Sequence, residues 1–284
     1  MRTAIFAKRR ASASCPSPRS RPKQALKSSA AGSAEARELA SFFGDESERA
    51  DTEAFLVGSA LRALSASRSS ARRFDHFTLI DSDKPSCIEL ESVVDSDFPE
   101  MKDRVNVLCE DANAALDEYI GSMDWGNTRA LVFLDPYGLE VRWGTIMRLA
   151  GTGACDVWYL FPLGGVIRMM RNDGQIPDTW QARLDQLFGT LDWYDEFYST
   201  GRQESLFGDE HDLVYKDAST QQVVSYVRER LLTTFPAVSK AGILRNRKGS
   251  PLFALVLGIS NPGKPAQNVA LGIGNHLVKD LTES

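Results

Sequence analysis

The sequence predicts an α/β protein built on a doubly wound, mostly parallel β-sheet. Two observations support this prediction: short apolar runs alternate with helical segments, and the runs themselves are unbroken. Unbroken apolar runs are typical of strands buried on both faces, and strand–helix alternation is typical of βαβ units. The clearest run is residues 130–134, which is too short for a helix and ends abruptly in Asp135, Pro136, Tyr137 and Gly138.

Length and composition narrow the class of protein. The chain has 284 residues, enough for one α/β domain with appendages, and a net charge of −5. This charge argues against a protein that mainly holds nucleic acid through phosphates, although a local basic patch could still do so. No stretch reaches the roughly 18 apolar residues of a membrane span, so we expect a cytoplasmic protein.

The four cysteines do not form a metal-binding pattern. Cys15, Cys87, Cys109 and Cys155 are scattered, with no CxxC pair and no nearby histidine. We therefore expect no metal site, and we interpret Cys109 and Cys155 as small apolar strand residues.

Residues 1–34 differ from the rest of the chain because they contain many basic residues and no acidic one. They are also rich in Ser, Ala and Pro, so they bury little apolar surface and we expect a disordered, basic, low-complexity segment. Three interpretations remain open. The segment could be an organellar transit peptide, a basic tail that touches nucleic acid, or an unrelated start fused upstream of a truncated domain.

From residue 35 to residue 161, helical and strand patterns alternate. Helices are expected where apolar residues recur on one face, as do Phe55, Leu61 and Leu64, and strands where a short run is wholly apolar. The chain turns after residue 134, because Pro136 keeps Asp135 out of the helical region. The expected elements are helices 35–43 and 52–67, strand 77–80, helix 85–94, strand 105–109, helix 112–121, strand 130–134, helix 140–150 and strand 157–161.

Beyond residue 161 the pattern loosens into a small helical and aromatic cap at about residues 165–215. A charged turn at 168–174 precedes a helix at 177–188, and residues 201–212 have the composition of a polar, mobile loop. An aromatic cluster follows the helix, and it suits a packed cap over the sheet better than a platform for stacking bases. The cluster consists of Trp193, Tyr194, Phe197 and Tyr198.

The C-terminal part predicts two helices around a pair of strands. Residues 219–235 form an amphipathic helix, and strands at 241–245 and 252–259 suit an antiparallel pair at the sheet edge. A closing helix at 266–281 carries an apolar stripe. The stripe consists of Val269, Ile273, Leu277 and Leu281.

Three acids follow consecutive strands. Asp81 and Asp135 come directly after theirs, and Asp111 lies two residues past Cys109. Because parallel strands point the same way, we expect these acids to meet at one edge of the sheet, where α/β folds bind ligands. The alternatives are chance placement of loop acids and simple turn chemistry at residues 135–138.

These acids suit a nucleoside cofactor. Asp81 could accept hydrogen bonds from both ribose hydroxyls, and Asp111 one from the amine of an adenine ring. Asp135 could orient or deprotonate an attacking amine, while Tyr137 covers a planar substrate next to Pro136. This arrangement is typical of an enzyme that transfers a methyl group from a nucleoside cofactor. A glycine-rich first turn is missing, since no GxG occurs before Gly151, and a weak nucleotide site is the consequence.

Several longer blocks of the chain resemble one known family. The blocks are FLVGSALRAL at 55–64, FTLID at 77–81, EDANAAL at 110–116, VFLDPYGLEVRW at 132–143, LFPLGGVIRM at 160–169, RLDQLFGTLDWYDEFY at 183–198, ILRN at 243–246 and NHLVKDL at 275–281. Over residues 51–284 they resemble the three-Cys-motif partner family, TcmP. The resemblance implies a Rossmann-like, class I methyltransferase-like fold that binds S-adenosylmethionine. It also implies a partner, a three-cysteine iron–sulfur protein of the radical type.

The resemblance also implies roles for single residues. Asp81 matches the acid after the second strand, where the family usually has Glu, and Asp111 matches the acid after the third strand. Asp135, Pro136, Tyr137 and Gly138 match the motif after the fourth strand. From the chemistry expected of the site, we predict that Asp135 and Tyr137 are the catalytic pair. A further match is a Gly-Ser pair downstream of the family's glycine loop, formed here by Gly58 and Ser59.

One part of the family pattern has no counterpart in residues 1–50: the first strand and its loop, D-x-F-A-G-x-G. We therefore expect this strand and loop to be missing or degenerate, and we prefer the interpretation of the N-terminal segment as an unrelated start. The missing loop favours a second hypothesis, a catalytically impaired partner subunit that docks through the sheet edge and residues 180–198. A third hypothesis is nucleic-acid modification, because residues 135–137 resemble the acid-Pro-aromatic motif of base-modifying methyltransferases.

Overall fold

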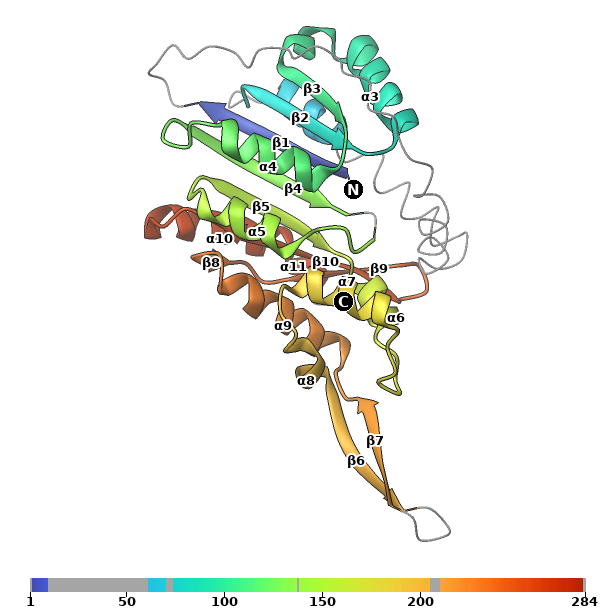
Figure 1. Cartoon of the computed structure of the whole chain (residues 1–284). Helices are drawn as coiled ribbons and strands as arrows, with labels where there is room; N and C mark the ends of the chain where they lie inside the picture. The colour runs from blue at the N-terminus through green and yellow to red at the C-terminus, as the bar shows by residue number, and fades with distance from the viewer. Residues whose placement is uncertain (1, 10–60, 70–73, 137, 205–209, 283–284) are drawn as a thin grey trace.

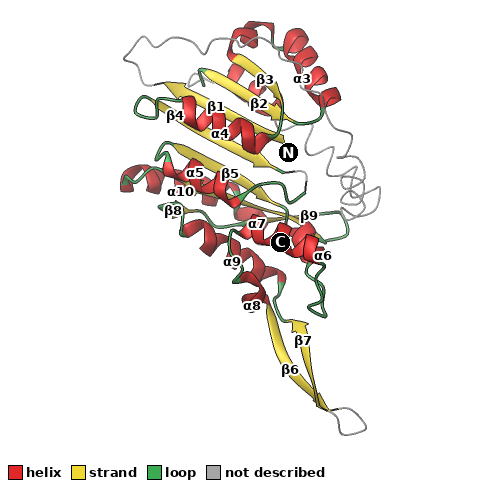
Figure 2. Cartoon of the chain, in the orientation of Figure 1, coloured by secondary structure: helices red, strands yellow, loops and turns green. Residues whose placement is uncertain are grey.

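The computed structural model describes residues 2–9, 61–69, 74–136, 138–204 and 210–282. In these residues the chain is an α/β protein, with a mixed eight-stranded sheet that helices cover and a separate two-stranded hairpin (Figures 1 and 2). The expected helix at 35–43 and the first part of the expected helix at 52–67 lie outside the described residues. Residues 61–69 are helical.

Four strands that follow one another along the chain run in the same direction. They are β2 (His76–Asp81), β3 (Val105–Cys109), β4 (Thr128–Asp135) and β5 (Cys155–Phe161). β2 and β3 pair in parallel, as do β4 and β5, and each was expected from an apolar run. The strand order is β3-β2-β1-β4-β5-β10-β8, with β9 also paired to β10.

The N-terminal segment corrects two predictions. The expectation of disorder is wrong for Arg2–Arg9, which forms strand β1 between β2 and β4, while residues 10–34 lie outside the described residues. β1 is antiparallel to both neighbours, so the sheet is mixed and not mostly parallel. Ile5 lies opposite Thr78 on one side and Val132 on the other, and its side chain is buried. Composition averaged over 34 residues concealed this strand, because strand pairing uses backbone groups that every residue carries.

The C-terminal strands confirm the expected antiparallel edge. β10 (Pro251–Ile259) runs antiparallel to β5, and both β9 (Gly242–Arg245) and β8 (Ala237–Val238) pair with β10. The apolar run of β10 matches its burial on both faces, since residues 253–254 and 256–259 are all buried.

Helices pack against both faces of the sheet. On one face, Val132, Val157 and Phe161 share the largest core with apolar side chains of α4, α5, α7 and α9. On the other face, Phe77 and Leu79 pack with Leu64 and with α3. The helices are α3 (Lys84–Asp97), α4 (Ala112–Ser122), α5 (Trp143–Gly151), α7 (Asp178–Phe188) and α9 (Thr220–Leu232), and the 3-10 helix η1 (Pro99–Arg104) leads into β3.

The cap consists of α6 (Leu163–Met169), α7, α8 (Trp193–Phe197) and a hairpin. Its aromatic cluster is core: Trp193 and Phe197 are buried, with their ring centroids 6.0 and 5.9 Å from that of Phe188. The expectation of a loop at 201–212 is wrong where β6 (Tyr198–Glu204) and β7 (Glu210–Lys216) pair as a ribbon that projects from the body (Figure 1). Backbone pairing holds this ribbon, so the apolar alternation that would reveal a strand on a core is missing.

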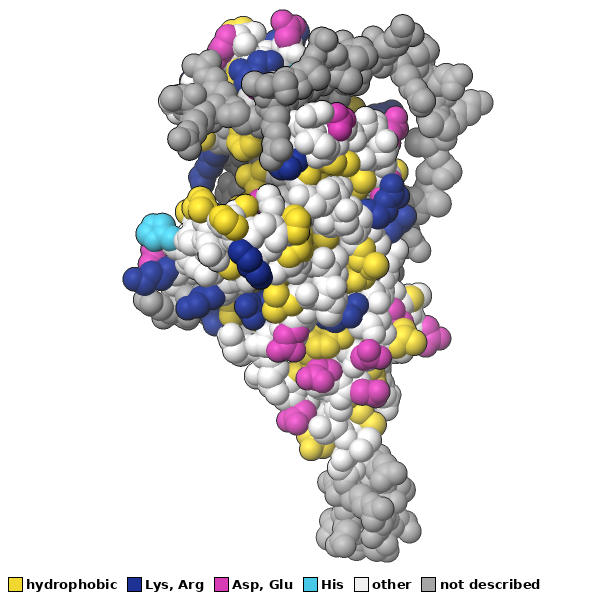
Figure 3. Space-filling view, turned by 90° about the vertical axis from the view of Figure 1, so that its left-hand side faces the viewer, with side chains coloured by type: hydrophobic (Ala, Val, Ile, Leu, Met, Phe, Trp, Pro, Cys, Tyr) yellow, Lys and Arg dark blue, Asp and Glu magenta, His cyan; other side chains and the backbone are white. Residues whose placement is uncertain are grey.

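The last helices are α10 (Lys264–Leu277) and α11 (Lys279–Thr282). Of the apolar stripe expected on the closing helix, Val269, Ile273 and Leu277 are exposed and do not face the core, whereas Leu281 lies in α11 and is half-buried. Figure 3 views the side of the molecule at which one end of α10 lies, and hydrophobic side chains are visible at the surface there.

Candidate functional site at the carboxyl edge of the sheet

Asp81 and Asp135 end the two strands that flank β1. Asp135 lies opposite Arg2 in the β1–β4 ladder, and Ile80 lies opposite Thr3 in the β1–β2 ladder. Both aspartates are buried. With neighbouring strands about 4.8 Å apart, their backbones lie about 10 Å from each other at the same edge of the sheet.

Asp111 lies next to Asp81. Cys109 is paired with Asp81 across the β2–β3 ladder, and the backbone N–H of Glu110 donates to the Asp81 carbonyl at 3.0 Å. Asp111 is the following residue. Asp81, Asp111 and Asp135 are therefore all at the edge where β2, β3 and β4 end.

Two of these acids also accept hydrogen bonds from backbone groups close to them in the sequence. Asp81 Oδ1 accepts a hydrogen bond from the backbone N–H of Asp83 at 3.0 Å, in the turn before α3. Asp111 is the N-cap of α4, and its Oδ1 accepts from the N–H of Ala114 at 3.0 Å. This is the turn and cap chemistry of the alternative interpretation. The side chain of Asp111 is exposed, so its Oδ2 can still accept a hydrogen bond from a ligand.

The segment after Asp135 begins with a tight bend. Pro136 is buried, and Gly138 has a φ of 90°, which glycine adopts without steric cost. Tyr137 lies outside the described residues, as do Gly58 and Ser59. Of the predicted site residues, the structure thus brings together Asp81, Asp111, Asp135 and Pro136.

Asn113 holds this segment in place, and sequence reasoning missed it. Its Nδ2 donates to the carbonyl of Glu140 at 2.9 Å. Its Oδ1 accepts from the backbone N–H of Arg142 at 3.1 Å and from the hydroxyl of Thr145 at 3.0 Å. The sequence did carry a signal for this residue, because Asn113 lies among the apolar residues Ala112, Ala115 and Leu116 on the buried side of α4. A polar side chain that is buried in this way needs hydrogen-bond partners.

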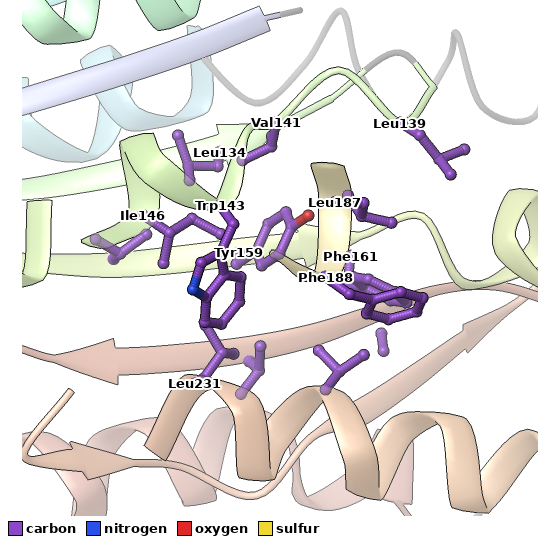
Figure 4. Close-up of a cluster of buried hydrophobic side chains, with 14 of the residues drawn as sticks. Leu134, Leu139, Val141, Trp143, Ile146, Tyr159, Phe161, Leu187, Phe188 and Leu231 are labelled. Atoms are coloured by element: carbon purple, nitrogen blue, oxygen red, sulfur yellow. The ribbon is translucent and has the colours of Figure 1, made fainter. Parts of the chain in front are cut away.

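A packed core anchors the same segment from below. Leu139, Val141 and Trp143 are buried in one cluster with Tyr159 and Phe161 of β5. Figure 4 shows these side chains gathered on the face of the sheet that carries Tyr159. The segment that leads away from Asp135 is therefore pinned by apolar contacts as well as by Asn113.

Two thiols lie at the same edge. The Cys87 thiol donates to the carbonyl of Asp81 at 3.3 Å, and Cys109 ends the neighbouring strand. Burial, together with the neighbouring Cys109, raises the pKa of Cys87 to about 12, so this thiol is protonated at neutral pH. Cys109 is exposed. The expectation that it would be a small apolar strand residue holds for its place in β3 and not for its burial.

Within the described ranges, no three His, Cys, Asp or Glu side chains gather closely enough to hold a metal ion. No helix in this part of the chain has the length and apolar character to cross a membrane. Comparisons with protein-family models, with curated proteins and with solved structures find no match to this chain.

The direction of β1 limits what this edge can bind. β1 begins at the acidic edge, with Arg2 opposite Asp135, and ends at the other edge, with Arg9 opposite Thr128. In dinucleotide-binding folds the first strand ends at the ligand edge, and its glycine-rich turn meets the ligand there. Here the chain that follows β1 leaves from the opposite edge. At the acidic edge, Asp111 therefore offers an exposed acceptor, Asp81 and Asp135 are buried, and the central strand brings no glycine turn to it.

Proposed function

We propose that this chain is a methyltransferase-like protein of the three-Cys-motif partner type, which binds the nucleoside part of S-adenosylmethionine at the carboxyl edge of its sheet. The observation that carries the proposal is the placement of Asp81, Asp111 and Asp135 at that one edge. The strand order β3-β2-β1-β4-β5 also supports it, since it is the order of the Rossmann fold up to that point. The reversed β1 is a departure from that fold.

The proposal assigns a separate task to each acid. Asp81 accepts hydrogen bonds from the ribose hydroxyls, and Asp111 accepts one from the adenine amine through its exposed carboxylate. Asp135, with Pro136 and Tyr137, faces the reacting end and orients or deprotonates an attacking amine. S-adenosylmethionine, when bound, supplies an electrophilic methyl group. In this proposal the three-cysteine iron–sulfur protein is the partner.

The nucleoside part of the cofactor fits the residues present better than the methionine part does. Acceptors for ribose and adenine are at the edge, whereas the chain after β1 leaves from the opposite one. This observation favours a second candidate function, a partner subunit with the fold of a methyltransferase and no cofactor turnover. In that case the protein contributes binding surfaces to a complex and catalyses no reaction itself.

Calorimetric titration with S-adenosylhomocysteine separates the two candidates. The enzyme proposal expects saturable heat that Asp81→Asn removes, because asparagine keeps the acceptor for Asp83 N–H but cannot accept both ribose hydroxyls as a carboxylate does. The control is Asp95→Asn, which alters an exposed acid paired with Lys102 and should leave binding unchanged. Absence of heat from the folded wild type supports the partner subunit.

Transfer of a labelled methyl group tests activity directly. The enzyme proposal expects incorporation in the presence of the iron–sulfur partner that Asp135→Asn abolishes. Incorporation into DNA or RNA would support the nucleic-acid hypothesis, and incorporation into protein with none into DNA or RNA would contradict it. No incorporation into any of the three, together with measurable binding of S-adenosylhomocysteine, would identify a cofactor-binding protein without turnover on these substrates.

A further inference from the structure

Helix α10 turns an apolar stripe toward solvent. Val269, Ile273 and Leu277 are 66, 57 and 58% exposed, and they recur every four residues, so they lie on one face of the helix. Exposed apolar residues are ordinary when they are scattered singly. Three in line along one helix form a continuous apolar stripe, and contiguous apolar patches are typical of interaction surfaces.

The opposite face of α10 is firmly attached to the protein, so the stripe cannot rotate inward. Gln267 is buried and its Nε2 donates to the carbonyl of Asn261 at 2.9 Å. Asn275 Oδ1 accepts from the backbone N–H of Lys240 at 2.7 Å. A Cβ on Gly274 would lie 3.0 Å from Leu257 and 3.2 Å from Ser239, so the helix sits as close to the sheet as its backbone allows.

The stripe lies in a stretch without charged side chains. Residues 265–278 contain no Asp, Glu, Lys or Arg, although the chain as a whole carries 33 basic and 38 acidic residues. The exposed face of a helix in a soluble protein normally carries charges. A surface of one sign would repel its own copy, whereas an uncharged apolar surface is complementary to itself.

Gly272 is a second, independent indication that another polypeptide backbone packs closely against α10. It is exposed in the middle of α10, and a Cβ built there would meet nothing within 4 Å. A glycine inside a helix costs about 0.5–1 kcal/mol relative to alanine, and packing within the protein does not require this one. A second backbone crossing the helix at this point would require it.

We propose that α10 is a homodimer interface, in which the stripes of two copies pack antiparallel about a two-fold axis at Ile273. The spacing is self-complementary, because Val269 and Leu277 are each four residues from Ile273. In this arrangement Ile273 contacts its own copy, and Val269 contacts Leu277 of the other copy. An isologous interface of this kind closes after two subunits. The occupant is thus a second copy of this chain.

Sedimentation of the full chain over a range of protein concentrations tests the proposal. The wild type is expected to pass from monomer to dimer in the micromolar range, and Ile273→Asp to remain a monomer. The control is Leu191→Asp, which changes an apolar residue that is 68% exposed on the cap and should still dimerise. A wild type that is monomeric at all concentrations overturns the proposal, and so does an Ile273→Asp dimer.

Cysteine cross-linking tests the register in a background with Cys15→Ser and Cys109→Ser. Oxidation with diamide should join two copies of Ile273→Cys to each other. It should join Val269→Cys to Leu277→Cys in a mixture, and neither to itself. Cross-linking of Val269→Cys to its own copy overturns the antiparallel arrangement.

Gly272→Ala separates an interface from a merely exposed helix. Alanine should raise the unfolding temperature of the monomer, because it favours the helix, and weaken dimerisation by about tenfold, because its methyl group separates the two backbones. A monomeric wild type in which Ile273→Cys resists thiol reagents would indicate that a segment of the same chain covers the stripe, which overturns the proposal.

Discussion

Asp81 and Asp135 lie on either side of β1, each at the last residue of a strand that pairs with it. The antiparallel β1 keeps these two strands parallel to each other, so both acids reach the same edge of the sheet. A parallel strand in this place would have the same effect on the acids. It would differ only in delivering the start of its following loop to their edge, and in this sequence no glycine occurs in the 22 residues that follow β1.

The first prediction concerns the contribution of β1 to the fold. Ile5 is 1% exposed, so Ile5→Ala should lower the free energy of unfolding by about 3 kcal/mol through lost burial and the cavity that remains. Urea unfolding at constant m-value measures this loss. The control is Ile88→Ala, at a position 66% exposed, which should change stability by less than about 0.5 kcal/mol. Equal stability of the Ile5 variant and wild type would show that residues 2–9 are not part of the folded sheet.

The second prediction concerns the support of the segment after Asp135. Asn113→Ala removes three hydrogen bonds and leaves the hydroxyl of Thr145 without this partner, so we expect a loss of about 3 kcal/mol. The matched control is Asn127→Ala, an exposed asparagine whose amide donates to Asp124. Chemical unfolding compares the two variants. If the control lost as much stability as Asn113→Ala, the buried hydrogen bonds of Asn113 would contribute no more to stability than an exposed one.

The third prediction separates two reasons for glycine. Gly189 and Gly249 both have positive φ, 65° and 82°, but a Cβ on Gly189 would lie 2.2 Å from the Trp143 ring, whereas Gly249 has open space. Gly249→Ala should cost about 1 kcal/mol from backbone strain alone. Gly189→Ala should cost at least about 2 kcal/mol more, because Trp143 must move away from its contact with the Arg230 guanidinium. Thermal unfolding of both variants gives the comparison, and similar melting temperatures would contradict it.

The fourth prediction concerns stability at alkaline pH. Burial raises the pKa of the Cys155 thiol from 9.0 to about 12. Stability from this thiol is fully present below pH 9 and is lost toward pH 12, because the unfolded chain releases the proton first. The contribution to the slope is about 1.4 kcal/mol per pH unit. Cys155→Ala should start less stable because of the cavity but lose stability less steeply between about pH 9 and pH 12 in reducing buffer. An unchanged slope would contradict this assignment.

The sequence predicted those parts of the protein that depend on local pattern. The apolar runs ending at Asp81, Cys109, Asp135 and Phe161 are strands β2 to β5, and the segments between them contain the expected helices. The common edge of the acids followed from strand direction, which the spacing of strands and helices indicates. Local pattern also predicted the antiparallel strands at the C-terminal edge, which are β9 and β10.

Other features were decided only by pairing and packing between distant parts of the chain. The insertion of Arg2–Arg9 between β2 and β4 depends on backbone groups, which are the same in every residue and leave little trace in composition. The task of Asn113 depends on a segment 27 or more residues away. The outward direction of the α10 stripe depends on Gln267 and Gly274 fitting the surface beneath. The residue pattern along the chain thus determined most of the helices and strands and the sheet edge that carries the three acids. The tertiary structure alone determined that β1 lies between β2 and β4 and that one face of α10 stays exposed. Both of these features depend on contacts between residues far apart in the sequence.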